Sequence, residues 1–160
     1  MENIVRKAEV KFILTRELGR LAKWLRILGY DTIYFYQANS GSLLIQALRE
    51  DRIILTRNHR LSRPGGAPIV MVRSEILKEQ IGEVLKQLHI EPRDDIMFSL
   101  CVICNTRLIP VSKEKVKDKV PEYVFSTQED FITCPSCNRV YWQGTHWGNV
   151  KEMLKEIGLS

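Results

Sequence analysis

All four cysteines of this chain stand in two Cys-x-x-Cys motifs that lie well apart, at Cys101, Cys104, Cys134 and Cys137. Each motif can present two thiolates to one ion, and two motifs complete the tetrahedral sulfur set that Zn²⁺ prefers. The alternatives are disulfides or clustered free thiols, but disulfides belong to exported chains and we see no signal-peptide pattern. Four cysteine ligands leave no coordination position open, so we predict a structural zinc ion rather than a catalytic one.

The positive charge of the chain is concentrated in its first part. The net charge is +5, and residues 1–63 hold 12 Lys and Arg against 6 Asp and Glu, whereas residues 99–160 hold 8 against 7. A basic region of this kind attracts an anionic partner such as RNA. No apolar run approaches the ~20 residues of a membrane helix, so we expect a cytoplasmic protein with no membrane partner.

Short apolar runs alternate with amphipathic segments over the first ninety or so residues. Strands are expected at 9–15, 31–36, 52–56 and 68–72, and helices at 16–28, 42–50 and 74–88. This alternation predicts an α/β domain with a parallel sheet flanked by helices. The polar segment 91–95 is the expected boundary, which divides the chain into residues 1–92, 97–149 and 150–160.

The two cysteine motifs predict a zinc ribbon over residues 97–149. Strands are expected at 108–111 and 140–142, after the first and second motif respectively. Between them, residues 112–120 read as a charged helix that ends at Pro121. A final amphipathic helix is expected at 151–157.

The first predicted helix carries a row of cations at spacings of four, three and three residues: Arg16, Arg20, Lys23 and Arg26. These side chains share one helix face. One interpretation is a solvated surface, and the other is a site that contacts RNA phosphates. Trp24 lies beside this face, where it either stacks on a base or rests on the edge of the core.

Three stretches resemble the Mut-seven C-terminal RNase family: LGRLAKWLRILGYD at 18–31, ILTR at 54–57 and YWQGTHW at 141–147. The resemblance covers about residues 10 to 149. It implies a PIN-like domain followed by a zinc ribbon, and a ribonuclease (a hydrolase) whose acidic residues at the strand ends hold two Mg²⁺ or Mn²⁺ ions.

The chain departs from the family pattern at the acidic positions themselves. Neutral side chains occupy all of them: Thr15, Asn39, Ser40 and Asn58. These groups do not offset the charge of a divalent ion, and all are residue types preferred at helix N-caps. Of the remaining acids, we expect Glu17 to point away from the site and Asp31 to lie at the opposite edge of the sheet.

The same strand ends have a second interpretation as an anion pocket. Helix N-termini together with Arg16, Arg57 and His59 would then bind a phosphate in place of the metal ions. His146 stands in the third family-like stretch, and we interpret it as a packing residue because the cysteines already fill the zinc sphere.

Three functions remain open from the sequence. The first is a PIN-type enzyme that cuts RNA with Mg²⁺ or Mn²⁺, and the second is a non-catalytic relative that binds nucleic acid through the basic helix. The third is a protein adaptor that uses the zinc ribbon as its contact surface. The missing carboxylates leave it undecided whether the chain is an enzyme.

Overall fold

The computed structural model describes residues 10–61 and 66–159. Its first part contains four parallel strands in the order β2-β1-β3-β4, namely β1 (Lys11–Thr15), β2 (Asp31–Phe35), β3 (Ile53–Thr56) and β4 (Ile69–Met71). Each coincides with a strand expected from the apolar runs and is slightly shorter than expected. The prediction of an α/β domain with a parallel sheet flanked by helices is therefore confirmed.

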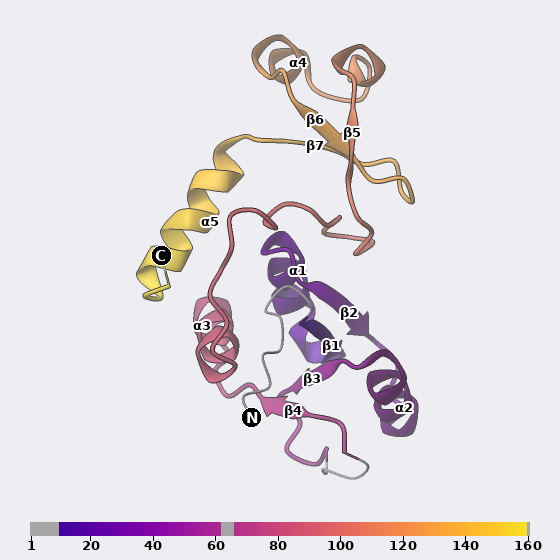
Figure 1. The fold of residues 1–160 in the computed structure, drawn as a ribbon, viewed down its shortest axis with the longest axis vertical. Helices are drawn as coiled ribbons and strands as arrows, with labels where there is room; N and C mark the ends of the chain where they lie inside the picture. Colours follow the sequence, from indigo (N-terminus) through magenta and orange to yellow (C-terminus); the bar gives the residue numbers. More distant parts are fainter. Residues whose placement is uncertain (1–9, 62–65, 160) are drawn as a thin grey trace.

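Helices cover both faces of this sheet (Figure 1). One face is covered by α1 (Gly19–Ile27) and α3 (Leu77–Gln87), whose apolar cluster α5 (Thr145–Glu156) also joins, and the other face by α2 (Ser40–Glu50). Side chains alternate along β1, so Phe12 and Leu14 pack in the cluster that contains α1, while Ile13 packs with α2. Burial on both faces explains why the strands read as continuous apolar runs.

The carboxyl ends of the four parallel strands lie at one edge of the sheet. There β1 passes into a short 3-10 helix, η2 (Arg16–Leu18), before α1 begins at Gly19. The sequence predicts a single helix over 16–28, so this turn is a difference from the expectation. Gly19 allows α1 to start close to the sheet, since a Cβ there would lie 3.3 Å from the ring of Tyr34.

Beyond the α/β domain the chain forms an outer module, residues 108–143 (Figure 1). Its strands β5 (Ile109–Val111), β6 (Phe131–Thr133) and β7 (Val140–Trp142) form an antiparallel sheet beside η3 (Lys113–Val116) and α4 (Glu122–Thr127). The charged helix expected at 112–120 is only the short η3. Pro121 begins α4 rather than ending a helix, because its carbonyl accepts hydrogen bonds from Val124 N and Phe125 N.

The chain then returns to the first domain through α5. This helix begins at Thr145, six residues before the expected start at 151. Its apolar residues Val150, Leu154 and Ile157 belong to the same buried cluster as α1 and α3. The ring of Trp147 stacks on that of Phe98, with centroids 4.6 Å apart. The C-terminal helix is thus part of the α/β core.

The first cysteine motif is also attached to the α/β domain. Its turn, residues 101–106, is here called the first cysteine knuckle. Arg26 of α1 is 8% exposed, and its guanidinium donates hydrogen bonds to Thr32 O at 2.9 Å, Val102 O at 2.8 Å and Ile103 O at 3.1 Å. The expectation that Arg26 shares an exposed basic face is therefore wrong, because its charge is buried against carbonyls of β2 and of the knuckle.

Asn105 completes this attachment at the edge strand β2. Its Oδ1 accepts from Thr32 N at 3.0 Å, and its Nδ2 donates to Asp31 Oδ1 at 2.7 Å. Arg52 donates to the same carboxylate at 2.8 Å, and it is itself buried beneath β1 and β2. Burial raises the pKa of Asp31, but the hydrogen bonds from Arg52 and Asn105 outweigh it and hold the pKa below its usual range. Asp31 is the first residue of β2, so it lies at the amino ends of the strands, away from their carboxyl ends, as expected from the sequence.

We predict that Arg26→Met lowers the free energy of unfolding by about 2–4 kcal/mol, because buried carbonyls lose a charged donor. Arg20→Met is the matched control, since Arg20 lies on the exposed part of the same helix and its loss should cost less than about 0.5 kcal/mol. Urea denaturation of both variants measures the difference. Equal effects of the two substitutions would show that Arg26 does not hold the knuckle to the domain.

Candidate functional site

The two cysteine motifs form matching backbone turns, the first knuckle and a second at residues 134–139. In each turn the N–H of the first cysteine donates to the carbonyl oxygen of the residue five positions later, Cys101 to Thr106 and Cys134 to Arg139. The N–H of the asparagine that follows each motif donates back to the carbonyl oxygen of the first cysteine, Asn105 to Cys101 and Asn138 to Cys134. All four distances are 2.8–2.9 Å. Asn105 and Asn138 adopt φ near +60°, at 61° and 62°. Asparagine tolerates this left-handed conformation, so the pattern Cys-x-x-Cys-Asn was a signal for these turns that the sequence-based prediction missed.

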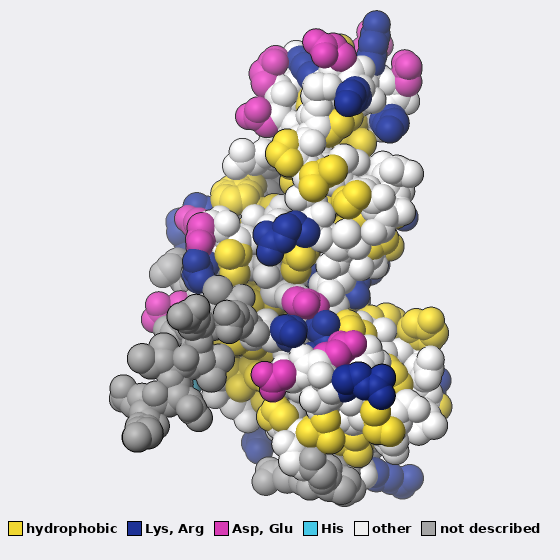
Figure 2. All heavy atoms as spheres, turned by 45° about the vertical axis from the view of Figure 1, so that its right-hand side comes forward, with side chains coloured by type: hydrophobic (Ala, Val, Ile, Leu, Met, Phe, Trp, Pro, Cys, Tyr) yellow, Lys and Arg dark blue, Asp and Glu magenta, His cyan; other side chains and the backbone are white. Residues whose placement is uncertain are grey.

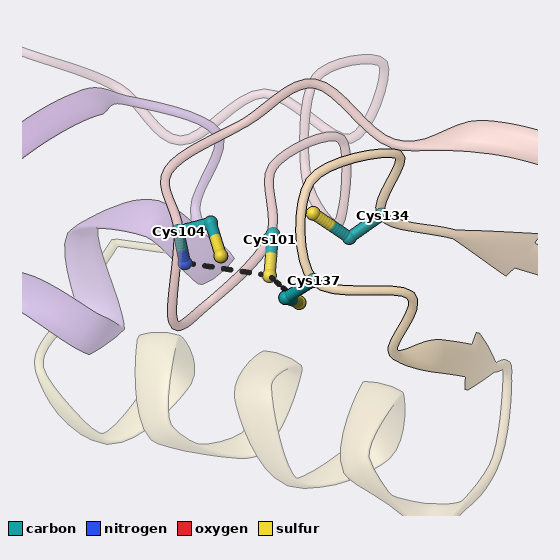
Figure 3. Close-up of side chains that lie close together, drawn as sticks. All are labelled: Cys101, Cys104, Cys134 and Cys137. Atoms are coloured by element: carbon teal, nitrogen blue, oxygen red, sulfur yellow. Dashed lines mark hydrogen bonds between the residues drawn. The ribbon is translucent and has the colours of Figure 1, made fainter.

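The sulfur atoms of the four cysteines face one another (Figure 3). Their ligand atoms all lie within 4.8 Å of one another, and Cys101 Sγ is 3.7 Å from Cys137 Sγ. A tetrahedral ion with Zn–S bonds of about 2.3 Å needs sulfurs about 3.8 Å apart. All four are free thiols in this structure, which sets aside the disulfide alternative. The cluster could hold a metal ion, and its donor set and spacing fit zinc.

Cys101 is the most constrained of these ligands. It is fully buried, and its sulfur lies 3.1 Å from the Tyr141 hydroxyl of β7 and 3.4 Å from Cys104 N. Burial raises the pKa of the Cys101 thiol, but the hydrogen bonds from Tyr141 and from backbone N–H groups outweigh it and lower the pKa. The thiolate, which is the form that ligates a metal, is therefore favoured at Cys101, whereas the hydrogen bond with Cys137 and burial raise the pKa of Cys104 to about 12.

The second candidate site lies at the carboxyl ends of the strands. A cavity of about 220 Å³ there is lined by all four of the positions that the sequence resemblance assigns to acidic residues, namely Thr15, Asn39, Ser40 and Asn58. Arg16, Glu17 and Gln37 also line it. We call this cavity the strand-end pocket. Among the described residues that line it, Glu17 carries the single carboxylate.

The sequence-based expectation that Glu17 points away from Thr15 is wrong. Glu17 Oε1 lies 2.6 Å from Thr15 Oγ1, 3.0 Å from Arg57 N and 3.3 Å from Thr56 Oγ1. The 3-10 turn η2 causes this, because its tighter winding directs the side chain back over the strand ends. Burial raises the pKa of Glu17, but these hydrogen bonds prevail and the pKa lies below its ordinary value. The carboxylate is therefore ionised at neutral pH, and all three hydrogen bonds go to the same oxygen, Oε1.

Backbone amides at the pocket are satisfied by the chain itself. Asn39 Oδ1 caps α2 by accepting from Gly41 N at 3.0 Å and Ser42 N at 3.2 Å, and Asn58 Oδ1 accepts from Arg60 N at 3.0 Å. Asn39 is thus an N-cap as expected, whereas Thr15 makes no capping bond. The Nδ2 groups of both asparagines have no partner among the described residues. Because the side-chain oxygens of these two asparagines already accept hydrogen bonds, the groups that they can still offer to a ligand are mainly N–H donors.

The other expected anion ligands lie elsewhere. Arg57 directs its guanidinium toward Arg73 O at 3.4 Å and Glu75 at 3.5 Å, and His59 is exposed outside the pocket lining. Arg20 and Lys23 are exposed on α1, whereas Trp24 rests against the core. His146 belongs to α5, but its side chain lies outside the described part of the structure.

In the part of the chain that the structure describes, the cysteine cluster is the one group of three or more His, Cys, Asp or Glu side chains placed to share an ion. No helix among the described residues is long and apolar enough to cross a membrane.

Comparison with known proteins agrees with the fold and the cysteine cluster. The model of the Mut7-C RNAse domain matches residues 10–154, which include the parallel sheet, both cysteine knuckles and most of α5. No curated protein and no solved structure matches the chain. Since this match spans most of the sequence, the chain belongs to the Mut7-C RNAse domain family.

Proposed function

We propose that this protein binds RNA, with a backbone phosphate in the strand-end pocket, and that it does not cleave RNA through a divalent-metal site. One observation carries the proposal. The positions that the sequence resemblance assigns to the family's acidic site line one cavity, but the described residues there carry a single carboxylate, whose Oε1 already accepts three hydrogen bonds.

Charge decides between a metal site and a phosphate site. Two divalent ions bring four positive charges, and hard cations such as Mg²⁺ rely on carboxylates to offset them. The strand-end pocket offers Glu17, and the neighbouring Arg16 cancels its charge. Neutral hydroxyl and amide oxygens add ligands but no negative charge.

The same side chains suit an anion. Arg16, the Ser40 hydroxyl and the Nδ2 groups of Asn39 and Asn58 can donate to phosphate oxygens. Arg20 and Lys23 extend the positive charge along the exposed part of α1, where further phosphates of a bound strand would lie. Arg26 has no place in this surface, because it is buried under the first knuckle.

We also propose that the four cysteines hold zinc. With four thiolates the ion would have a structural role and would supply no open position for a reacting group. The thiolates would leave a net charge of −2 on the cluster, and the buried guanidinium of Arg26 lies against the carbonyls of the same knuckle.

Restoring the carboxylates tests the metal argument. Thr15→Asp, Asn39→Asp and Asn58→Asp in one variant should create Mn²⁺ affinity that the parent lacks, measured by isothermal titration. The control is Ser112→Asp, Ser126→Asp and Thr127→Asp, which adds the same charge at exposed positions of the outer module. The parent should leave single-stranded RNA intact with Mn²⁺. Tight Mn²⁺ binding at Glu17 with RNA cleavage by the parent would instead favour the metal-dependent nuclease.

Removing the positive charge of α1 tests RNA binding. Arg16→Gln, Arg20→Gln and Lys23→Gln together should weaken binding to all RNA sequences alike. The salt dependence should also flatten, by roughly one unit of slope for each phosphate that the variant no longer neutralises. Fluorescence anisotropy of a labelled oligoribonucleotide at several salt concentrations gives both quantities.

The matched control replaces three exposed lysines of the outer module, Lys115→Gln, Lys117→Gln and Lys119→Gln. On the face that Figure 2 shows, charges of both signs are mixed on this module. If the control variant loses as much RNA affinity as the α1 variant, the RNA does not lie on α1 and the proposed site is wrong.

A further inference from the structure

Tyr36 stands out beside the strand-end pocket because its large ring is 70% exposed. It directly follows β2, and it lies two residues beyond Tyr34. Side chains alternate along an extended chain, so both tyrosines are directed to the same face. Their ring centroids are 6.3 Å apart at an interplanar angle of 51°.

Tyr34 gives this exposed ring a fixed support. Its hydroxyl donates to Arg16 O at 2.5 Å, which joins it to the turn between β1 and α1. The ring also lies against the start of α1, where Gly19 leaves just enough room for it. Tyr36 therefore lies beside a ring that is itself tied to η2.

The position of Tyr36 links the two parts of the proposed RNA site. The residues on either side of it, Phe35 and Gln37, line the strand-end pocket. Arg16 lines the same pocket and supports Tyr34 through its carbonyl oxygen. By the same alternation the ring of Tyr36 is directed away from Phe35 and Gln37, to the face on which Tyr34 packs against the start of α1, so it lies beside the strand-end pocket and not in its lining.

We propose that Tyr36 is a stacking platform for one unpaired RNA base whose neighbouring phosphate occupies the strand-end pocket. This rests on the proposed function, and it specifies the ligand as single-stranded RNA. An exposed aromatic ring beside cationic side chains is the arrangement by which proteins hold single strands without regard to sequence. A base within a duplex is already stacked on its neighbours and offers no face to the ring.

Tyr123 provides a matched control for this role. It is 71% exposed, so it presents nearly the same area of ring, but it belongs to α4 in the outer module. An acidic residue, Glu122, precedes it in the same helix. The effect of Tyr123→Ala on RNA affinity therefore measures what an exposed tyrosine outside the proposed site contributes to non-specific binding.

The test compares three variants on three probes. The variants are Tyr36→Ala, Tyr36→Phe and Tyr123→Ala. The probes are a labelled single-stranded oligoribonucleotide of about 10 nucleotides, the same backbone with its bases removed, and the corresponding duplex. Dissociation constants come from fluorescence anisotropy, and circular dichroism verifies that each variant is folded.

Tyr36→Ala should weaken binding of the single strand by roughly fivefold or more, because stacking of one base is lost. Tyr36→Phe should keep affinity within about twofold, since phenylalanine retains the ring, and Tyr123→Ala should have no effect. The abasic backbone and the duplex should bind the parent and Tyr36→Ala equally, because neither offers an unpaired base.

Each contrary outcome identifies which proposal fails. If the parent binds the single strand but Tyr36→Ala behaves like Tyr123→Ala, the stacking role is overturned and the phosphate pocket stands. A loss of affinity for the abasic backbone in Tyr36→Ala also overturns it, since that loss reports a structural role of the ring. A parent that binds none of the probes overturns the proposed function and the stacking role together.

Discussion

The buried hydrogen bonds from Arg26 and Asn105 connect the cysteine cluster to the α/β domain. Arg26 reaches carbonyls of both β2 and the first knuckle, and Asn105 pairs with the backbone of Thr32 and the carboxylate of Asp31. Together they cover part of the edge of β2, where strand N–H and C=O groups would otherwise be exposed. Metal binding contributes on the order of 10 kcal/mol to small cysteine-rich modules. If the cluster holds zinc as proposed, these contacts would pass part of that free energy to β2.

The strand-end pocket shows how a shared fold can carry different chemistry. The parallel sheet sets the position of the cavity, but the side chains that line it determine what binds there. Thr15, Asn39 and Asn58 keep the size and hydrogen-bonding capacity of a polar site without its negative charge. Glu17 then acts as an acceptor for Thr15, Thr56 and the Arg57 amide, so it stabilises the turn between β1 and α1. Under the proposed function this edge binds an anion, because a single carboxylate remains among the described residues that line the pocket.

Features with local causes could be predicted from the sequence, whereas those with distant partners could not. The strands, the parallel sheet and the position of Asp31 follow from apolar runs and from the direction of the chain. Arg26 is buried because it bonds to the carbonyls of Val102 and Ile103, which lie far along the chain. Its spacing from the other cations of the first predicted helix gave no sign of these partners and was that of an exposed helix face. Glu17 was misplaced because a 3-10 turn replaces the first turn of the predicted helix. The helix α4 was missed because a proline can either end one helix or begin the next.

The central claim is that the cysteine cluster stabilises the α/β domain through Arg26 and Asn105. Hydrogen exchange measured by mass spectrometry, with the zinc-loaded protein compared before and after chelation, tests it most directly. The account predicts faster exchange after chelation in the outer module, at the end of α1 and at β2, because the Thr32 N–H of β2 would lose its hydrogen bond to Asn105. The strand β3 should stay protected. Faster exchange confined to residues 99–144, with β2 and α1 unchanged, would contradict the claim.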